Sequence, residues 1–91
     1  MTKKQMIEEL KRRFMEILEI WKFEIGETMK NKWSADRVKA RNNEYSNRVL
    51  GFLRASNVIL DANDYETWEM IYRSYFERIS KGIEDYSMHM Q

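Results

Sequence analysis

The sequence predicts an all-α fold, an antiparallel three-helix bundle, and three observations indicate it. Apolar residues recur every three or four positions along most of the 91-residue chain, which is the period of a helix and not of a strand. The chain has no proline and only three glycines, so little interrupts long helices. Short polar segments near residues 31–34 and 60–64 divide it into three stretches of about 25 residues, and such short connections join antiparallel neighbours.

The first helix is expected over residues 3–30. Thr2 is its candidate N-cap, because a threonine hydroxyl accepts a hydrogen bond from an unpaired backbone N–H of the first turn. At 100° per residue, apolar side chains fall within a stripe about 140° wide that predicts the buried face. The stripe consists of Met6, Ile7, Leu10, Phe14, Ile17, Leu18, Trp21, Ile25 and Met29.

The second helix is expected over residues 35–58. Ser34 suits its N-cap, and Asp36 places a negative charge at the positive end of the helix dipole. Trp33 and Val38 have the spacing of a hydrophobic staple across that cap. The side expected to face the core consists of Val38, Asn42, Tyr45, Val49, Phe52, Leu53, Ser56 and Leu60.

The third helix is expected over residues 62–86, with Asp61 or Asn63 as its N-cap. Residues 87–91 are expected to form a disordered tail, and residues 1–91 a single domain. The apolar stripe of this helix is rich in aromatic residues, and core packing is the preferred explanation for them. It consists of Tyr65, Trp68, Ile71, Tyr72, Tyr75, Phe76, Ile79, Ile83 and Tyr86.

The composition argues against enzymatic and metal chemistry. Without cysteine there is no disulfide framework, thiolate zinc site or cysteine nucleophile. The one histidine, His89, lies in the expected tail, where the Met88-His89-Met90 triplet is a weak signal for a soft cation such as Cu(I). Residues 61–72 lack the glycine and glutamate that a calcium loop needs at its sixth and twelfth positions. We therefore expect no catalytic residues, no metal and no cofactor, and infer no small-molecule substrate.

No uninterrupted apolar segment of about 20 residues occurs, so neither a signal peptide nor a membrane span is expected, and the expected location is cytoplasmic. The net charge of +1 hides a strong asymmetry. Residues 30–60 carry seven basic and two acidic side chains, a net of +5, whereas residues 61–91 carry three basic and seven acidic, a net of −4. Such segregation predicts either attraction between the second and third helices or two faces of opposite sign.

Two surfaces are candidates for binding. Met15, Ile20 and Phe23 lie outside the apolar stripe of the first helix and form the candidate protein interface. The second candidate is a basic segment with one tryptophan, suited to nucleic acid or to an acidic partner. It consists of Lys30, Lys32, Trp33, Arg37, Lys39, Arg41 and Arg48, with Lys39 displaced from the side that the arginines share.

These features lead us to expect a small non-enzymatic protein that binds a partner protein and modulates or inhibits it. By analogy, accessory proteins of phages and mobile elements are of this type. One alternative is a nucleic-acid-binding or regulatory protein that uses residues 30–54. The other is a structural homodimer or assembly adaptor built on the first helix.

Overall fold

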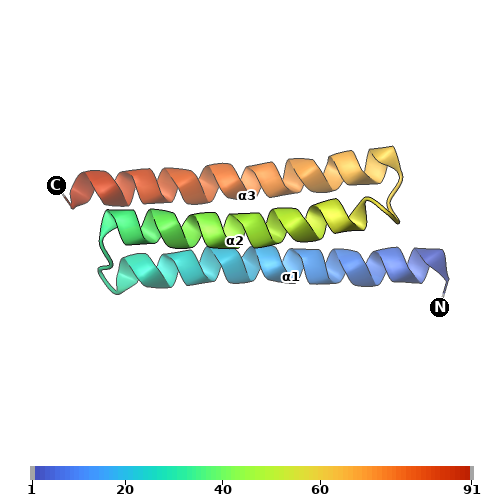
Figure 1. The fold of residues 1–91 in the computed structure, drawn as a ribbon, viewed down its shortest axis with the longest axis horizontal. Coiled ribbons are helices and arrows are strands. Elements are labelled where there is room, and N and C mark those ends of the chain that lie inside the picture. Colours follow the sequence, from blue (N-terminus) through green and yellow to red (C-terminus); the bar gives the residue numbers. More distant parts are fainter. Residues whose placement is uncertain (1, 91) are drawn as a thin grey trace.

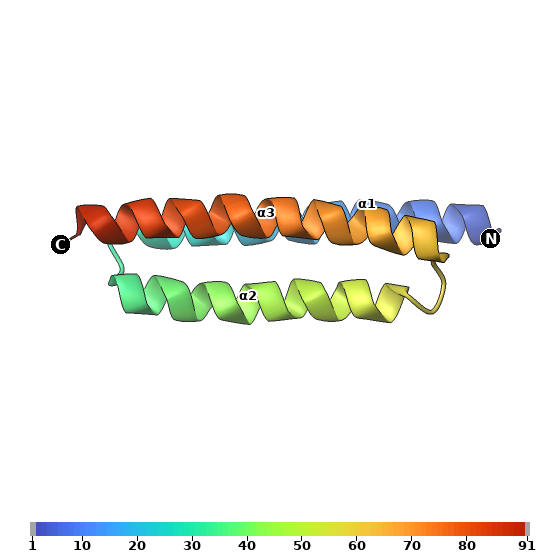
Figure 2. The ribbon, with the colours of Figure 1, turned by 90° about the horizontal axis from the view of Figure 1, so that it is seen from above.

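The computed structural model describes residues 2–90 and contains three α-helices that pack against one another, which confirms the expected fold class. Helix α1 spans Lys3–Lys30, α2 spans Ala35–Ser56 and α3 spans Ala62–His89. Consecutive helices run in opposite directions and form a rod measuring 52 × 20 × 15 Å (Figure 1). In the view from above, α3 lies along α1 and α2 is set to one side (Figure 2). The cross-section is therefore triangular, and each helix has two neighbours.

The starts of α1 and α2 follow from side-chain caps at the expected residues. The Thr2 hydroxyl accepts a hydrogen bond from the Gln5 amide at 3.2 Å, and the Gln5 side chain accepts one from the Thr2 amide at 2.9 Å. This reciprocal pair is a capping box, which satisfies two backbone donors at once. At α2, the Ser34 hydroxyl accepts a hydrogen bond from the Arg37 amide at 3.3 Å.

Helix α2 ends at Ser56, two residues before the expected end. The Ser56 hydroxyl donates to the carbonyl of Phe52 at 2.9 Å, within the last turn of the helix. The amides of Ile59 and Leu60 both donate to the Ser56 carbonyl at 3.0 Å and close the chain into a turn. Leu60 is thereby buried although it lies outside the helix.

At α3 the cap is Asp61 rather than Asn63, since the Asp61 carboxylate accepts a hydrogen bond from the Asp64 amide at 2.8 Å. The helix continues three residues beyond its expected end, to His89. The His89 ring Nδ1 donates to the carbonyl of Asp85 at 2.7 Å, a side-chain hydrogen bond within the last turn of the helix. The segment expected to be a disordered tail is thus helical as far as His89, and Gln91 lies outside the described residues.

The turn between α1 and α2 is a Schellman motif. The Trp33 amide donates to the Thr28 carbonyl and the Lys32 amide to the Met29 carbonyl, both at 3.1 Å. Lys32 has a φ of 62°, in the left-handed region where glycine normally stands. A side chain in this region costs about 1 kcal/mol, so the tight turn carries backbone strain.

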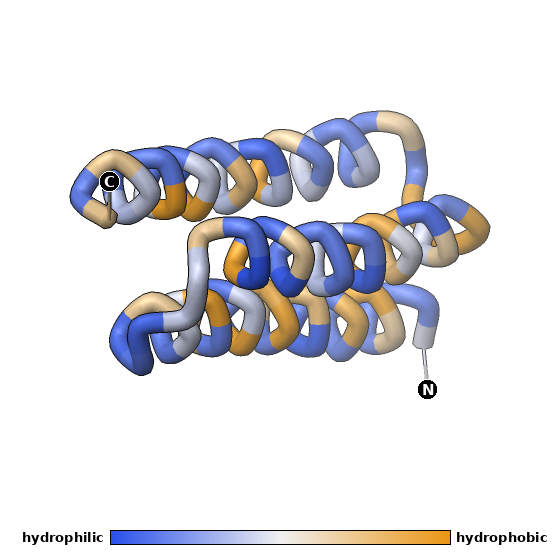
Figure 3. The backbone as a smooth tube through the Cα atoms, turned by 60° about the vertical axis from the view of Figure 1, so that its left-hand side comes forward, coloured by the Kyte–Doolittle hydropathy of each residue, from blue (hydrophilic) through white to orange (hydrophobic). Residues whose placement is uncertain are grey.

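The core is formed by the faces that the apolar spacing predicted, and hydrophobic positions recur along each helix (Figure 3). Phe14 lies at its centre, stacked on Trp68 with ring centres 5.1 Å apart and on Phe52 at 6.2 Å. Met6 and Phe76, both expected to face inward, are 40% and 41% exposed because they sit at the edges of their stripes. The buried apolar residues are Phe14, Leu18, Trp21, Ile25, Val38, Val49, Leu53, Leu60, Trp68, Ile79 and Ile83.

One hydrogen bond between side chains crosses the core from α1 to α2. The indole Nε1 of Trp21 donates to the Asn42 amide oxygen at 2.8 Å, and both residues are buried. Asn42 stands among the apolar residues of the inner side of α2, so its position there is explained by this bond. Because the indole N–H has no access to water, the bond favours one rotational setting of α1 against α2.

Candidate interaction surface

Three arginines lie along one side of α2, and each is held over an aromatic ring. The guanidinium carbon of Arg37 is 4.3 Å from the centre of the Trp33 ring. Those of Arg41 and Arg48 are 4.9 and 5.4 Å from the centre of the Tyr45 ring, which they approach from the preceding and following turns. Such cation–π contacts restrict the guanidinium groups and do not use their in-plane N–H donors.

The three arginines differ in how their charge is compensated. Arg41 pairs with Glu44 at 2.9 Å. This hydrogen bond is the main reason that the pKa of Arg41 is raised above its usual value, and Glu24 of α1 contributes to the same shift. Within residues 2–90, neither Arg37 nor Arg48 forms an ion pair, and both are exposed.

The ion pairs of the described chain do not hold the helices together. Each joins residues three or four positions apart on one helix, as exposed pairs that are each worth at most about 1 kcal/mol. They are Arg12–Glu9, Arg12–Glu16, Arg13–Glu9, Arg41–Glu44 and Arg73–Glu69. No ion pair joins α2 to α3 between residues 2 and 90, so the charge asymmetry of the sequence is left on the surface.

Two of the three apolar residues proposed as an interface do project from the bundle. Ile20 is 51% exposed and Phe23 is 64% exposed. Ile20 also lines a groove of about 250 Å³ between α1 and α2, in which Tyr45 and Arg48 form part of the opposite wall. Ile20 of the apolar patch and Arg48 of the basic segment, which the sequence presented as separate candidates, therefore line the same groove.

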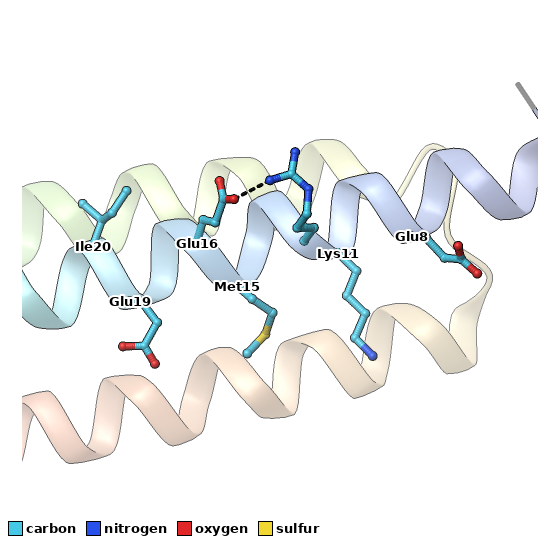
Figure 4. Close-up of a pocket in the computed structure, with 7 residues that line it drawn as sticks. Glu8, Lys11, Met15, Glu16, Glu19 and Ile20 are labelled. Atoms are coloured by element: carbon cyan, nitrogen blue, oxygen red, sulfur yellow. Dashed lines mark hydrogen bonds and ion pairs between the residues drawn. The ribbon is translucent and has the colours of Figure 1, made fainter.

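Met15 does not belong to this surface. It is half-buried and packs against the core. Figure 4 shows its side chain directed toward α3, whereas that of Ile20 is directed toward α2. Both line a shallow hollow on the outer face of α1, but they lie on opposite flanks of the helix. Met15 is thus less exposed than Ile20 and Phe23, and the interface expected from these three residues stays a prediction.

The lysines of the basic segment are scattered. Lys30 ends α1, and Lys32 stands in the following turn. Lys39 lies on the other side of α2, in a hollow that it shares with Phe76 and Glu84 of α3. This position agrees with the displacement predicted from the helical period. The lysines therefore add positive charge around the arginines without forming a continuous site with them.

We call the combined surface the arginine edge. It consists of Ile20, Tyr45 and Arg48, which line the groove, together with Arg37 and Arg41 on the same side of α2 and Phe23, one turn after Ile20 on α1. Sequence reasoning had placed Tyr45 in the core, although it is only half-buried and carries two of the arginines. Tyr45 lies four residues after Arg41 and three before Arg48, which is the spacing of neighbours on a helix surface. This spacing was the signal in the sequence that could have predicted the contacts of Tyr45 with both arginines.

Comparisons with protein-family models, with curated proteins and with solved structures found no match to this chain. Among residues 2–90, no three histidine, cysteine or acidic side chains are grouped closely enough to hold a metal ion. In the same part of the chain, α1, α2 and α3 are all too polar to serve as a membrane span.

Proposed function

We propose that this chain is a non-catalytic protein-binding module that modulates or inhibits its partner, and that the arginine edge binds an acidic amphipathic segment of that partner. The supporting observation is that exposed Arg48, which forms no ion pair within residues 2–90, lines one groove with exposed Ile20. Arg37, equally unpaired in that part of the chain, lies on the same side of α2, and exposed Phe23 follows Ile20 by one turn on α1. Charged and apolar contacts are thus available within one surface.

The two kinds of contact would have different roles. Guanidinium groups bind carboxylates through two parallel hydrogen bonds, and the rings of Trp33 and Tyr45 already restrict their orientation. Less side-chain entropy is then lost on binding. Phe23 and Ile20 would supply the apolar anchors from which most of the binding free energy of an interface comes. The excess positive charge of residues 30–60 would accelerate the approach of an acidic partner.

Nucleic acid is the second candidate, because phosphates also bind arginine. Two features favour a protein instead. Single-stranded nucleic acid needs aromatic faces on which bases stack, whereas the half-buried rings of Trp33 and Tyr45 are already covered by arginine guanidiniums. Moreover, the exposed side chains of Ile20 and Phe23 would have no partner on a phosphate backbone.

The test uses two double variants with the same change in net charge. Arg37→Glu with Arg48→Glu reverses the two unpaired arginines, while Lys39→Glu with Lys81→Glu reverses two exposed lysines elsewhere. Each immobilised protein is exposed to nuclease-treated extract of the native host, and the captured partner is then purified and titrated. We expect the arginine variant to lose at least about 30-fold in affinity and the lysine variant to bind nearly as the wild type does.

Phe23→Glu tests the apolar half of the surface. Because Phe23 is 64% exposed, its replacement should leave the melting temperature nearly unchanged and weaken the complex by roughly 30- to 1,000-fold. Capture from untreated extract that is lost after nuclease treatment would replace this proposal by the nucleic-acid alternative. Concentration-dependent self-association lost in Phe23→Glu would replace it by the homodimer. Undiminished partner binding in both the arginine variant and Phe23→Glu would show that another surface is used.

A further inference from the structure

A second feature of the molecule lies on the seam between α1 and α3, away from the arginine edge. Two of the three glycines in the chain, Gly26 and Gly82, line the same hollow from opposite helices. Neither has a positive φ, and a Cβ built on either one would meet no heavy atom within 4 Å. Neither backbone conformation nor close helix packing therefore requires glycine here. The effect of the two missing side chains is open space.

The hollow measures about 260 Å³, and its lining is mainly apolar. Buried Ile25 and Ile79 contribute from the two helices, and half-buried Met29 and Tyr75 complete the apolar lining. The Tyr75 hydroxyl donates to the Glu19 carboxylate at 2.8 Å, which holds the tyrosine across the seam.

Two cations, Lys22 and Arg78, also line the hollow. Both are exposed, and within residues 2–90 neither forms an ion pair. In this part of the chain, the two cations outnumber the one carboxylate bound to the lining, that of Glu19 at Tyr75. An apolar hollow with excess positive charge is complementary to a molecule that is apolar with one anionic end. Because its volume is just below the range of about 300–1,000 Å³ typical of sites for drug-sized ligands, the hollow suits a short chain.

We propose that this hollow binds a small anionic amphiphile, a carboxylate on a short apolar chain such as a medium-chain fatty acid. The chain would lie between Gly26 and Gly82, in the space that side chains would otherwise fill. The carboxylate would lie at Lys22 and Arg78. This inference is independent of the function proposed for the arginine edge, because the two surfaces lie on different seams and share no residue.

The probe is sodium octanoate, used below its micelle-forming concentration, with the intact chain labelled with ¹⁵N. The amide signals of Gly26 and Gly82 should shift with one saturable binding curve. Gly51 on α2 is an internal reference whose signal should stay in place, because it is also helical and open but does not line the hollow. From hexanoate to octanoate the affinity should rise by up to about fourfold per methylene.

Variants separate the two parts of the proposal. Gly26→Leu and Gly82→Leu should abolish octanoate binding, whereas Gly51→Leu should retain it, and circular dichroism checks that all three fold. Lys22→Gln with Arg78→Gln should weaken octanoate by roughly fivefold and leave the affinity for neutral octan-1-ol unchanged. Absence of glycine shifts at millimolar octanoate, unchanged binding by both leucine variants, or equal affinity of the wild type for octanoate and octan-1-ol would each overturn the proposal.

Discussion

Replacing Asn42 by alanine should destabilise the protein by about 2–4 kcal/mol, although asparagine is a polar residue and alanine a better helix former. Trp21 is fully buried, and its indole N–H donates to the Asn42 side chain at 2.8 Å. Removing the acceptor leaves this N–H without a partner, which costs about 1–3 kcal/mol. The small cavity left by the amide adds about 1 kcal/mol. The total is a large share of the 5–15 kcal/mol typical of a small domain.

The assay is urea unfolding of four proteins: the wild type, Asn42→Ala, Trp21→Phe and the double variant. In Trp21→Phe the donor is removed instead, and the Asn42 amide can turn to water because it lines a surface hollow. The double variant has no unpaired indole, so Asn42→Ala should cost about 1–3 kcal/mol less in the Trp21→Phe background than in the wild type. Trp33 and Trp68 remain in every variant as fluorescent reporters.

Two results would refute this reasoning. A loss below about 0.5 kcal/mol in Asn42→Ala would mean that the indole finds another acceptor at little cost. Equal effects of Asn42→Ala in both backgrounds would mean that the two side chains are not energetically coupled, whatever their distance. In either case the hydrogen bond could not be what favours the setting of α1 against α2.

Three further predictions concern stability. Alanine at each of the three glycines should raise the free energy of unfolding by about 0.5–1 kcal/mol, since a Cβ meets nothing within 4 Å at any of them. A lower free energy of unfolding in the Gly26 or Gly82 variant would show that α1 and α3 lie closer together there. Lys32→Gly should stabilise by up to about 1 kcal/mol in thermal unfolding by relieving the left-handed backbone, and destabilisation would contradict the strain. Burial, and then the hydrogen bond to Glu19, raise the pKa of the Tyr75 hydroxyl above 10.0, so the protonated hydroxyl stabilises the folded state. This contribution is fully present below about pH 10 and is lost as the pH rises through the raised pKa. Urea unfolding should therefore show a smaller loss of stability from pH 8 to pH 11 in Tyr75→Phe than in the wild type.

Much of the fold was predictable because a helix places every third or fourth residue on one side. That period assigned Asn42 to the inner side of α2 before any partner for it was known. The ends of α2 and α3 were not predictable from the same rule. Near each end a side chain bonds to a carbonyl four residues earlier, Ser56 to Phe52 and His89 to Asp85, but Thr67 makes the same bond to Asn63 inside α3. The helix ends therefore depend on local contacts that the apolar period does not contain.

The candidate site was predictable only in part, because the helical period gives the side of a helix and not the neighbour on that side. Arg37, Arg41 and Arg48 were correctly assigned to one side of α2. Whether that side lay along α1 or along α3 depended on the handedness of the bundle, that is, on which side of the α1–α2 pair α3 packs. The handedness also decided whether Ile20 and the arginines would lie on the same seam. The spacing of apolar residues along either helix does not determine the handedness.

The observed hand shows which interaction is the stronger. Opposite charges alone would favour placing the arginines of α2 against the acidic α3, yet the structure places them beside α1, next to Ile20 and Glu24. An exposed ion pair is worth at most about 1 kcal/mol, whereas burying one large apolar side chain is worth about 1.5–3 kcal/mol. The stacking of Phe14 on both Trp68 and Phe52 joins all three helices through such burial. Since burial of the core outweighs exposed ion pairs, this arrangement is favoured although Arg37 and Arg48 form no ion pair within residues 2–90, and their charge remains available to a partner.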